Sequence, residues 1–140
     1  MTLDDLKARI DAIEEGYEFF LAYAAQGLAG DQAGKADEQV RGYLRGFEEA
    51  LDGLAEAFRA HLPGSDAAEA GGPAGGEEAA AAANDALEVL RRDADASRAL
   101  LRLVVAQSAV SSQLIDNLNA SIHIRALLTD VFVLGEIVGV

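Results

Sequence analysis

The sequence contains no cysteine, no tryptophan and only two prolines. Without cysteine, neither a disulfide framework nor a thiolate metal site is possible. Eight aromatic residues, three Tyr and five Phe, argue against a large single-domain core. Basic residues are also scarce, because eleven Lys and Arg accompany 24 Asp and Glu and give a formal net charge of −13. This charge disfavours nucleic acid and anionic membrane surfaces as partners, since both require neutralising Lys or Arg.

Long apolar runs are missing as well. A membrane-spanning helix needs about 20 predominantly apolar residues, whereas the most apolar stretch, 99–124, is interrupted by Arg102, by three serines within 108–112 and by glutamines. The opening segment MTLDDLKARI is acidic and amphipathic, unlike a signal peptide. We therefore expect a cytoplasmic protein without a membrane span.

Both prolines lie in the glycine-rich segment PGSDAAEAGGPAGG, residues 63–76. This composition is typical of a flexible linker. It divides the chain into residues 1–62 and residues 77–140, which we treat as two helical units.

Residues 1–62 carry two apolar patterns with alternating spacings of three and four residues, which are typical of helices packed along heptad seams. The glycine-rich segment 27–35 separates them, and Thr2 with Asp5 predicts an N-cap pair at the start of the first. Folded back about residue 32, the patterns meet in matching register, which predicts an antiparallel αα-hairpin. The patterns are Leu3, Leu6, Ile10, Ile13, Tyr17, Phe20 and Ala24, then Val40, Leu44, Phe47, Leu51, Leu54, Phe58 and His61.

Residues 77–134 contain no Gly or Pro, and one seam runs through them from Leu87 to Ile122. A continuous helix of this length would measure about 87 Å at about 1.5 Å per residue. The alternative is a chain that folds back into a four-helix bundle, with its turn in RDADAS (92–97) or SAVSS (108–112). Neither segment offers Gly, Pro or Asn-Gly, so the sequence favours one long or gently kinked helix.

The stretch VVAQSAVSSQLIDNLNASI, residues 104–122, has one formal charge, Asp116. A second apolar stripe lies beside its seam, and one hairpin can cover only one side of it. We therefore expect an all-α helical bundle with coiled-coil packing, completed by a second copy of the chain in a homodimer or higher oligomer, or by another protein. Alternatively, the polar residues of the stretch face solvent. The predicted interface is Leu101, Val104, Ser108, Ser111, Ile115, Leu118 and Ile122.

The apolar tail LLTDVFVLGEIVGV, residues 127–140, would form an adhesive surface patch if it were exposed. Three interpretations remain open. The tail packs on the hairpin, docks on a partner copy or serves as a recognition peptide.

An aromatic cluster near the closed end of the hairpin is the best pocket candidate. Either it packs against the second half of the chain, or it lines an apolar ligand slot between helices. No general base or nucleophile accompanies its tyrosines. The cluster comprises Tyr17, Phe19, Phe20, Tyr23, Tyr43 and Phe47.

Metal and cofactor chemistry has little support. No Glu precedes either histidine by three residues, as helical di-iron sites require. Asp116, His123 and Asp130 recur every seven residues, about 10 Å apart along a helix, so only a symmetric partner could bring them together. We expect no cofactor. The basic run Arg91, Arg92, Arg98 and Arg102 is expected to meet an acidic face of the first two helices, in the same chain or in another copy.

These observations favour a non-catalytic helical interaction protein: a homo-oligomeric scaffold, adaptor or assembly accessory that acts through its weakly charged C-terminal helix. The alternative is a helical bundle that binds a small apolar ligand or a metal. No sequence feature supports an enzyme.

Overall fold

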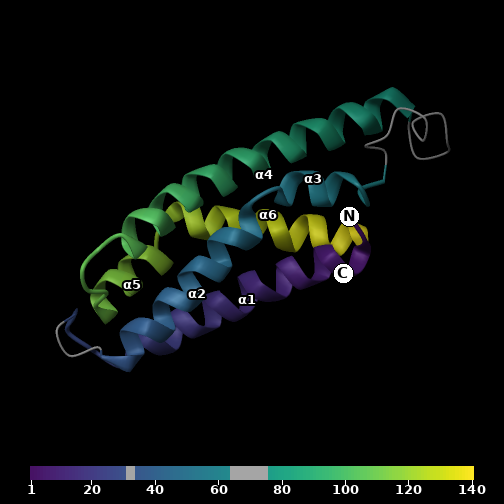
Figure 1. Cartoon of the computed structure of the whole chain (residues 1–140). Helices are drawn as coiled ribbons and strands as arrows, with labels where there is room; N and C mark the ends of the chain where they lie inside the picture. Colours follow the sequence, from purple (N-terminus) through teal and green to yellow (C-terminus); the bar gives the residue numbers. More distant parts are fainter. Residues whose placement is uncertain (31–33, 64–75) are drawn as a thin grey trace.

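The computed structural model describes residues 1–30, 34–63 and 76–140. Within these ranges the chain forms six α-helices and no strand, which confirms the all-α prediction (Figure 1). None of these six helices combines the length and the hydrophobicity that a membrane span requires. The helices are α1 (Leu3–Ala25), α2 (Lys35–Leu51), α3 (Leu54–Arg59), α4 (Gly76–Val105), α5 (Ser112–Asn119) and α6 (Ile122–Val138).

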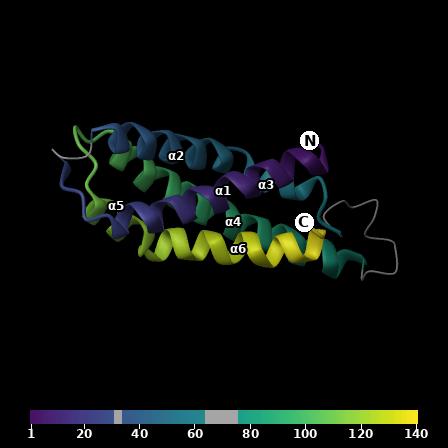
Figure 2. The same ribbon diagram turned by 90° about the horizontal axis from the view of Figure 1, so that it is seen from below.

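The helices form four antiparallel legs: α1, then α2 with α3, then α4, then α5 with α6 (Figures 1 and 2). Helix α2 packs between α1 and α4, α6 runs along α4, and α5 closes the bundle against α1. Both termini lie at the same end of the bundle (Figure 2). Most of the predicted linker, residues 64–75, falls outside the described residues.

The N-terminal hairpin forms as expected. Thr2 and Asp5 make a reciprocal capping box at the start of α1. Helix α1 packs on α2 in nearly the predicted register, with the rings of Phe20 and Phe47 5.9 Å apart. Gly16 permits this approach, because a Cβ atom there would lie 2.8 Å from Phe47 Cδ2. Most of the apolar residues of the two seams in residues 1–62 are therefore buried and form part of the core.

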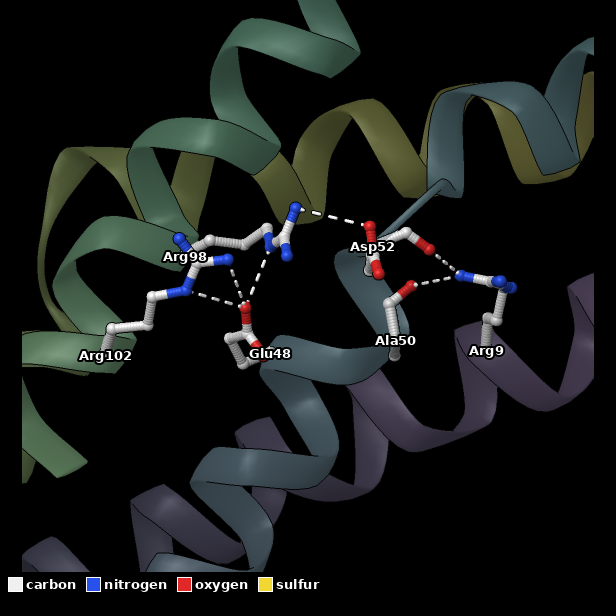
Figure 3. Close-up of polar contacts among 6 residues, drawn as sticks. All are labelled: Arg9, Glu48, Ala50, Asp52, Arg98 and Arg102. Atoms are coloured by element: carbon white, nitrogen blue, oxygen red, sulfur yellow. Dashed lines mark hydrogen bonds and ion pairs between the residues drawn. The ribbon is translucent and has the colours of Figure 1, made fainter.

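The second leg is interrupted, which the sequence pattern did not predict. Helix α2 ends at Leu51, and Gly53 adopts a left-handed conformation (φ 72°) before α3 begins. The Arg9 guanidinium of α1 donates to the carbonyl oxygens of Ala50 and Asp52 at this break (Figure 3). Leu54 and Phe58 nevertheless remain buried, so the apolar face of α3 still packs in the core.

The expectation of one long C-terminal helix is wrong. Helix α4 ends at Val105, and the chain turns within residues 106–111, in the second of the two predicted turn candidates, before α5 and α6 run back along the bundle. The turn needs no Gly or Pro because side chains from the first half bind its backbone. Arg41 donates to the carbonyl oxygens of Val105 (2.6 Å) and Gln107 (2.7 Å). These bonds satisfy carbonyl groups that a helix end leaves free.

The same turn is bound from two further positions. Asp37 accepts the backbone N–H of Val110 (2.9 Å), and the Tyr23 hydroxyl donates to the Val110 carbonyl. The hydrogen bond from Arg41 is the main cause that lowers the pKa of Asp37. Ser112 then attaches α5 to the end of α1, because its hydroxyl donates to the Tyr23 carbonyl (2.6 Å) and accepts from Leu28 N–H (2.9 Å).

The predicted contact between the basic run and an acidic face occurs within one chain. Arg98 and Arg102 of α4 both bind Glu48 of α2 at 2.9 Å (Figure 3). Arg98 also approaches Asp52 (3.5 Å), and Arg91 pairs with Glu56 of α3 (2.7 Å). These ion pairs fix α4 beside the second leg.

Candidate interaction surface

Helix α6 has one face in the core, and no other helix within residues 1–30, 34–63 and 76–140 covers its opposite face. Its buried residues follow the helical period and pack mainly along α4. Ser121 caps its N-terminus by accepting from Ile124 N–H (3.2 Å), which starts the new helix after the short α5. The buried residues are Ile124, Leu127, Leu128, Val131, Leu134 and Gly135.

The outer face of α6 is apolar and exposed. Ile122, Phe132, Val133 and Ile137 retain 76%, 56%, 55% and 55% of their accessible surface. Figure 2 shows α6 along one edge of the bundle, with no other helix on its outer side. Exposed large apolar side chains in a cluster usually mark a contact surface, so this face is the candidate site.

Charge is sparse along this helix. Its only charged residues are Arg125, Asp130 and Glu136, and Arg125 and Glu136 lie exposed on the outer face. Among the described residues, neither of these two forms an ion pair. The outer face therefore presents one cation and one anion within an apolar surface, and neither has an ion-pair partner in the described part of the chain.

Asp130 lies at the flank of α6 that adjoins α4. Its Oδ2 atom is buried and accepts no hydrogen bond. Burial raises the pKa of Asp130 to about 7, and hydrogen bonding to and repulsion by Asp93 of α4 act in the same direction. Close by, the Ser97 hydroxyl donates to the His123 carbonyl (3.2 Å) and joins the same two helices.

The residues of the interface predicted from the sequence do not form one surface, because some are buried in the core and others are exposed. Leu101, Val104, Ile115 and Leu118 lie in the core of a single chain. The fold-back thus covers most of the stretch that was expected to need a partner. Ser111 caps α5 by accepting from Leu114 N–H. Of the predicted set, Ser108 and Ile122 are exposed.

The predicted aromatic cluster is divided between core and surface. Phe20, Tyr23 and Phe47 are buried, whereas Tyr17, Phe19 and Tyr43 are half-buried. Phe19 and Tyr43 stack with ring centres 4.1 Å apart. A shallow groove of about 310 Å³ runs beside them, and it is lined by Ala12, Glu15, Gln39, Gly42, Tyr43, Gly46 and Phe47.

A second groove, of about 560 Å³, lies where α5 meets the end of α1. Asp116 and Gln113 supply its polar lining, and Leu21, which is 51% exposed, supplies an apolar wall. The remaining lining is largely alanine, glycine and serine, so the groove holds few groups that could recognise a ligand.

The weak metal candidates do not converge within one chain. Asp116 lines the groove beside α1, His123 is exposed, and Asp130 lies against Asp93. In the part of the chain that the structure describes, no three His, Asp or Glu side chains come together as a metal ion would need.

Sequence reasoning identified the apolar tail but did not separate its two faces. A helical projection of residues 122–138 could have done so, because at 3.6 residues per turn Phe132 falls opposite Leu127 and Leu134, and Val133 falls opposite Ile124 and Gly135. Comparison of the chain with protein-family models, curated proteins and solved structures finds no match.

Proposed function

We propose that this protein is a non-catalytic helical interaction protein, which associates with itself through the outer face of α6. The observation that carries the proposal is the exposure of Phe132, Val133 and Ile137 on a helix with only three charged residues. Such a face loses unfavourable contact with water when another apolar helix covers it, at roughly 25 cal/mol per Å² of buried apolar surface.

The distribution of charge favours this face for self-association. Only Asp116, Asp130 and Glu136 of the 24 acidic residues follow Asp95, and three arginines in the same region balance them. Two copies of a chain with net charge −13 repel each other over most of their surfaces. The repulsion is weakest where α6 faces outward, so two copies can approach there.

Solution mass as a function of concentration tests the proposal. We expect the wild type to rise above its monomer mass of 14.6 kDa between about 5 and 500 µM, the range for a modest interface. The variant Phe132→Ser/Ile137→Ser should stay monomeric with unchanged helical circular dichroism. Leu103→Ser is the control, because Leu103 is also apolar and 60% exposed but belongs to α4 rather than to α6. A wild type that remains a monomer throughout would refute self-association.

A second candidate function is binding of a small apolar ligand in the groove beside Tyr43. The groove is about 310 Å³ in volume and its floor includes Phe47, which suits a small aromatic or aliphatic molecule. A thermal-shift screen with such compounds tests it. Gly46→Leu should fill the groove and abolish any shift, because a Cβ atom at Gly46 meets no atom within 4 Å. If the shift persists in Gly46→Leu, the ligand binds elsewhere.

A further inference from the structure

The outer face of α6 carries a pattern that specifies how two copies would pair. Ile122, Arg125, Thr129, Phe132, Val133 and Glu136 are all exposed. At 3.6 residues per turn, these residues form one stripe opposite the buried Ile124, Leu127 and Val131. The stripe runs along the helix axis, so it is the natural line of contact with a second helix.

The two charged residues of the stripe lie on either side of its centre. Arg125 and Glu136 are eleven residues apart, about 16 Å along the axis, and their midpoint falls between residues 130 and 131. Thr129 and Phe132 are symmetric about the same midpoint. When a second α6 is placed antiparallel about a two-fold axis through this point, Arg125 faces Glu136 of the other copy, and Thr129 faces Phe132.

We infer that the protein forms a two-fold symmetric dimer in which the α6 helices pair antiparallel in this register. This inference rests on the proposed function and adds the partner, its orientation and the residues that set the register. Two identical Arg–Glu pairs then flank a central contact in which Phe132 of each copy meets Thr129 of the other, with Val133 beside it. A two-fold axis makes every contact occur twice.

Electrostatics separates this arrangement from its parallel alternative. In a parallel pair, Arg125 would face Arg125 and Glu136 would face Glu136, and like charges in direct opposition are unfavourable. In the antiparallel pair both charges find an opposite charge that the described residues of their own chain do not provide. Exposed ion pairs add little to affinity, but they select register and orientation.

The contact is small. A 17-residue helix is about 25 Å long, and one helix pair buries less than the roughly 1,600 Å² of a typical stable interface. We therefore expect a reversible dimer whose population rises with concentration, rather than a permanent one.

Charge reversal tests the register. Arg125→Glu and Glu136→Arg should each weaken dimerisation about tenfold, because each replaces two attractive pairs by two repulsive ones. The double variant Arg125→Glu/Glu136→Arg should regain the wild-type dissociation constant, since the pairs are restored with their signs exchanged. Arg92→Glu is the matched control: Arg92 is exposed on α4, and the substitution changes the net charge by the same amount as Arg125→Glu.

Disulfide trapping gives an independent readout, since the chain has no cysteine. The double variant Arg125→Cys/Glu136→Cys should oxidise to a covalent dimer. Neither single-cysteine variant should do so, because identical positions lie about 16 Å apart in this register. In a parallel dimer, identical positions would face each other, so each single-cysteine variant would form a covalent dimer.

The outcomes separate the two proposals. If the single charge variants dimerise like the wild type while Phe132→Ser/Ile137→Ser does not, the α6 face is the contact surface but the register is wrong. If the wild type is monomeric at every concentration, self-association through α6 fails and the register fails with it. Restoration by the double charge variant, together with cross-linking only of the double cysteine variant, would establish the antiparallel pair.

Discussion

Arg41 on α2 donates a hydrogen bond of 2.6 Å to the carbonyl oxygen of Val105, which lies 64 residues further along the chain and ends α4. The same guanidinium binds the Gln107 carbonyl and the carboxylate of Asp37. A single side chain of the second leg thereby binds the turn between the last two legs. It explains how the chain reverses direction without Gly or Pro.

We expect Arg41→Met to lower the free energy of unfolding by about 1–3 kcal/mol, because it leaves partly buried carbonyl groups and Asp37 without their donor. The methionine keeps much of the apolar stem of the arginine, so lost hydrogen bonds dominate the effect. Urea unfolding followed by circular dichroism measures it. Arg45→Met, at an exposed position on the same helix, should change stability by less than about 0.5 kcal/mol. Equal losses in both variants would show that the Arg41 contacts do not hold the turn.

Two glycines that precede and follow the hairpin turn should respond in opposite ways to the same substitution. Gly16→Ala should destabilise the protein by about 1–3 kcal/mol, since its new Cβ would lie 2.8 Å from the Phe47 ring in the packed core. Gly42→Ala should stabilise it by about 0.5–1 kcal/mol, because Gly42 is an exposed helical position with no atom within 4 Å of the new Cβ. Thermal unfolding of the two variants gives the comparison. A loss of stability in Gly42→Ala would show that this surface is already packed against something.

The local features of the fold could be predicted from the sequence because they depend on near neighbours. Spacings of three and four residues placed Leu6, Ile13, Leu44 and Phe58 in the core, where they are fully buried. The Thr2 cap follows from a four-residue pattern. The contact of the arginines of α4 with an acidic helix face followed from charge alone.

The fold-back could not be predicted in the same way. It depends on Arg41, Asp37 and Tyr23, which lie more than 60 residues before the turn that they bind, and periodicity carries no information about such contacts. The seam also continues through Val104 and Ile115 with helical spacing, because both residues face the same core from two different helices. The apolar surface of α6 was expected within the tail, but which of its residues stay exposed depends on where α4 lies.

The ion pairs of Glu48 should make stability depend on acid pH. Burial alone would raise the pKa of Glu48, but hydrogen bonds and charge from Arg98 and Arg102 outweigh it and hold the pKa below the ordinary value of 4.5. Because the native pKa is lowered, the stabilisation is present above pH 4.5 and is lost as the pH falls below it. Glu48→Gln should thus be less stable than the wild type at pH 7 by about 1 kcal/mol.

The difference should shrink as the pH is lowered toward 3, where the wild-type carboxyl group is protonated as well. Glu49→Gln is the control, because Glu49 is the exposed neighbour and forms no ion pair among the described residues. Urea unfolding at pH 3, 5 and 7 provides the measurement. A Glu48→Gln deficit that does not change with pH would mean that the amide disturbs packing rather than the ion pairs.

The pair formed by Asp130 and Asp93 should make the protein less stable as the pH rises, which is opposite to the effect of Glu48. The pKa of Asp130 is raised to about 7, first by burial and then by the neighbouring Asp93 carboxylate. Between pH 3.8 and about 7, the native protein keeps a proton that the unfolded chain releases, so the free energy of unfolding falls as the pH rises through this window. Above it, both carboxylates are charged in the native state and repel each other between α4 and α6.

Asparagine resembles protonated aspartic acid in shape and carries no charge. The substitution Asp130→Asn should therefore remove this pH dependence of the free energy of unfolding. We expect the variant to be more stable than the wild type by about 1 kcal/mol at pH 8, because solvent screens a partly exposed pair. It should match the wild type at about pH 3, below the ordinary pKa of 3.8, where Asp130 is largely protonated in both the native and the unfolded state. Asp116→Asn, at an exposed position on α5, should follow the wild-type curve throughout. Parallel pH profiles for Asp130→Asn and the wild type would show that Asp130 is ionised in the folded protein at neutral pH, and that the α4–α6 contact tolerates both charges.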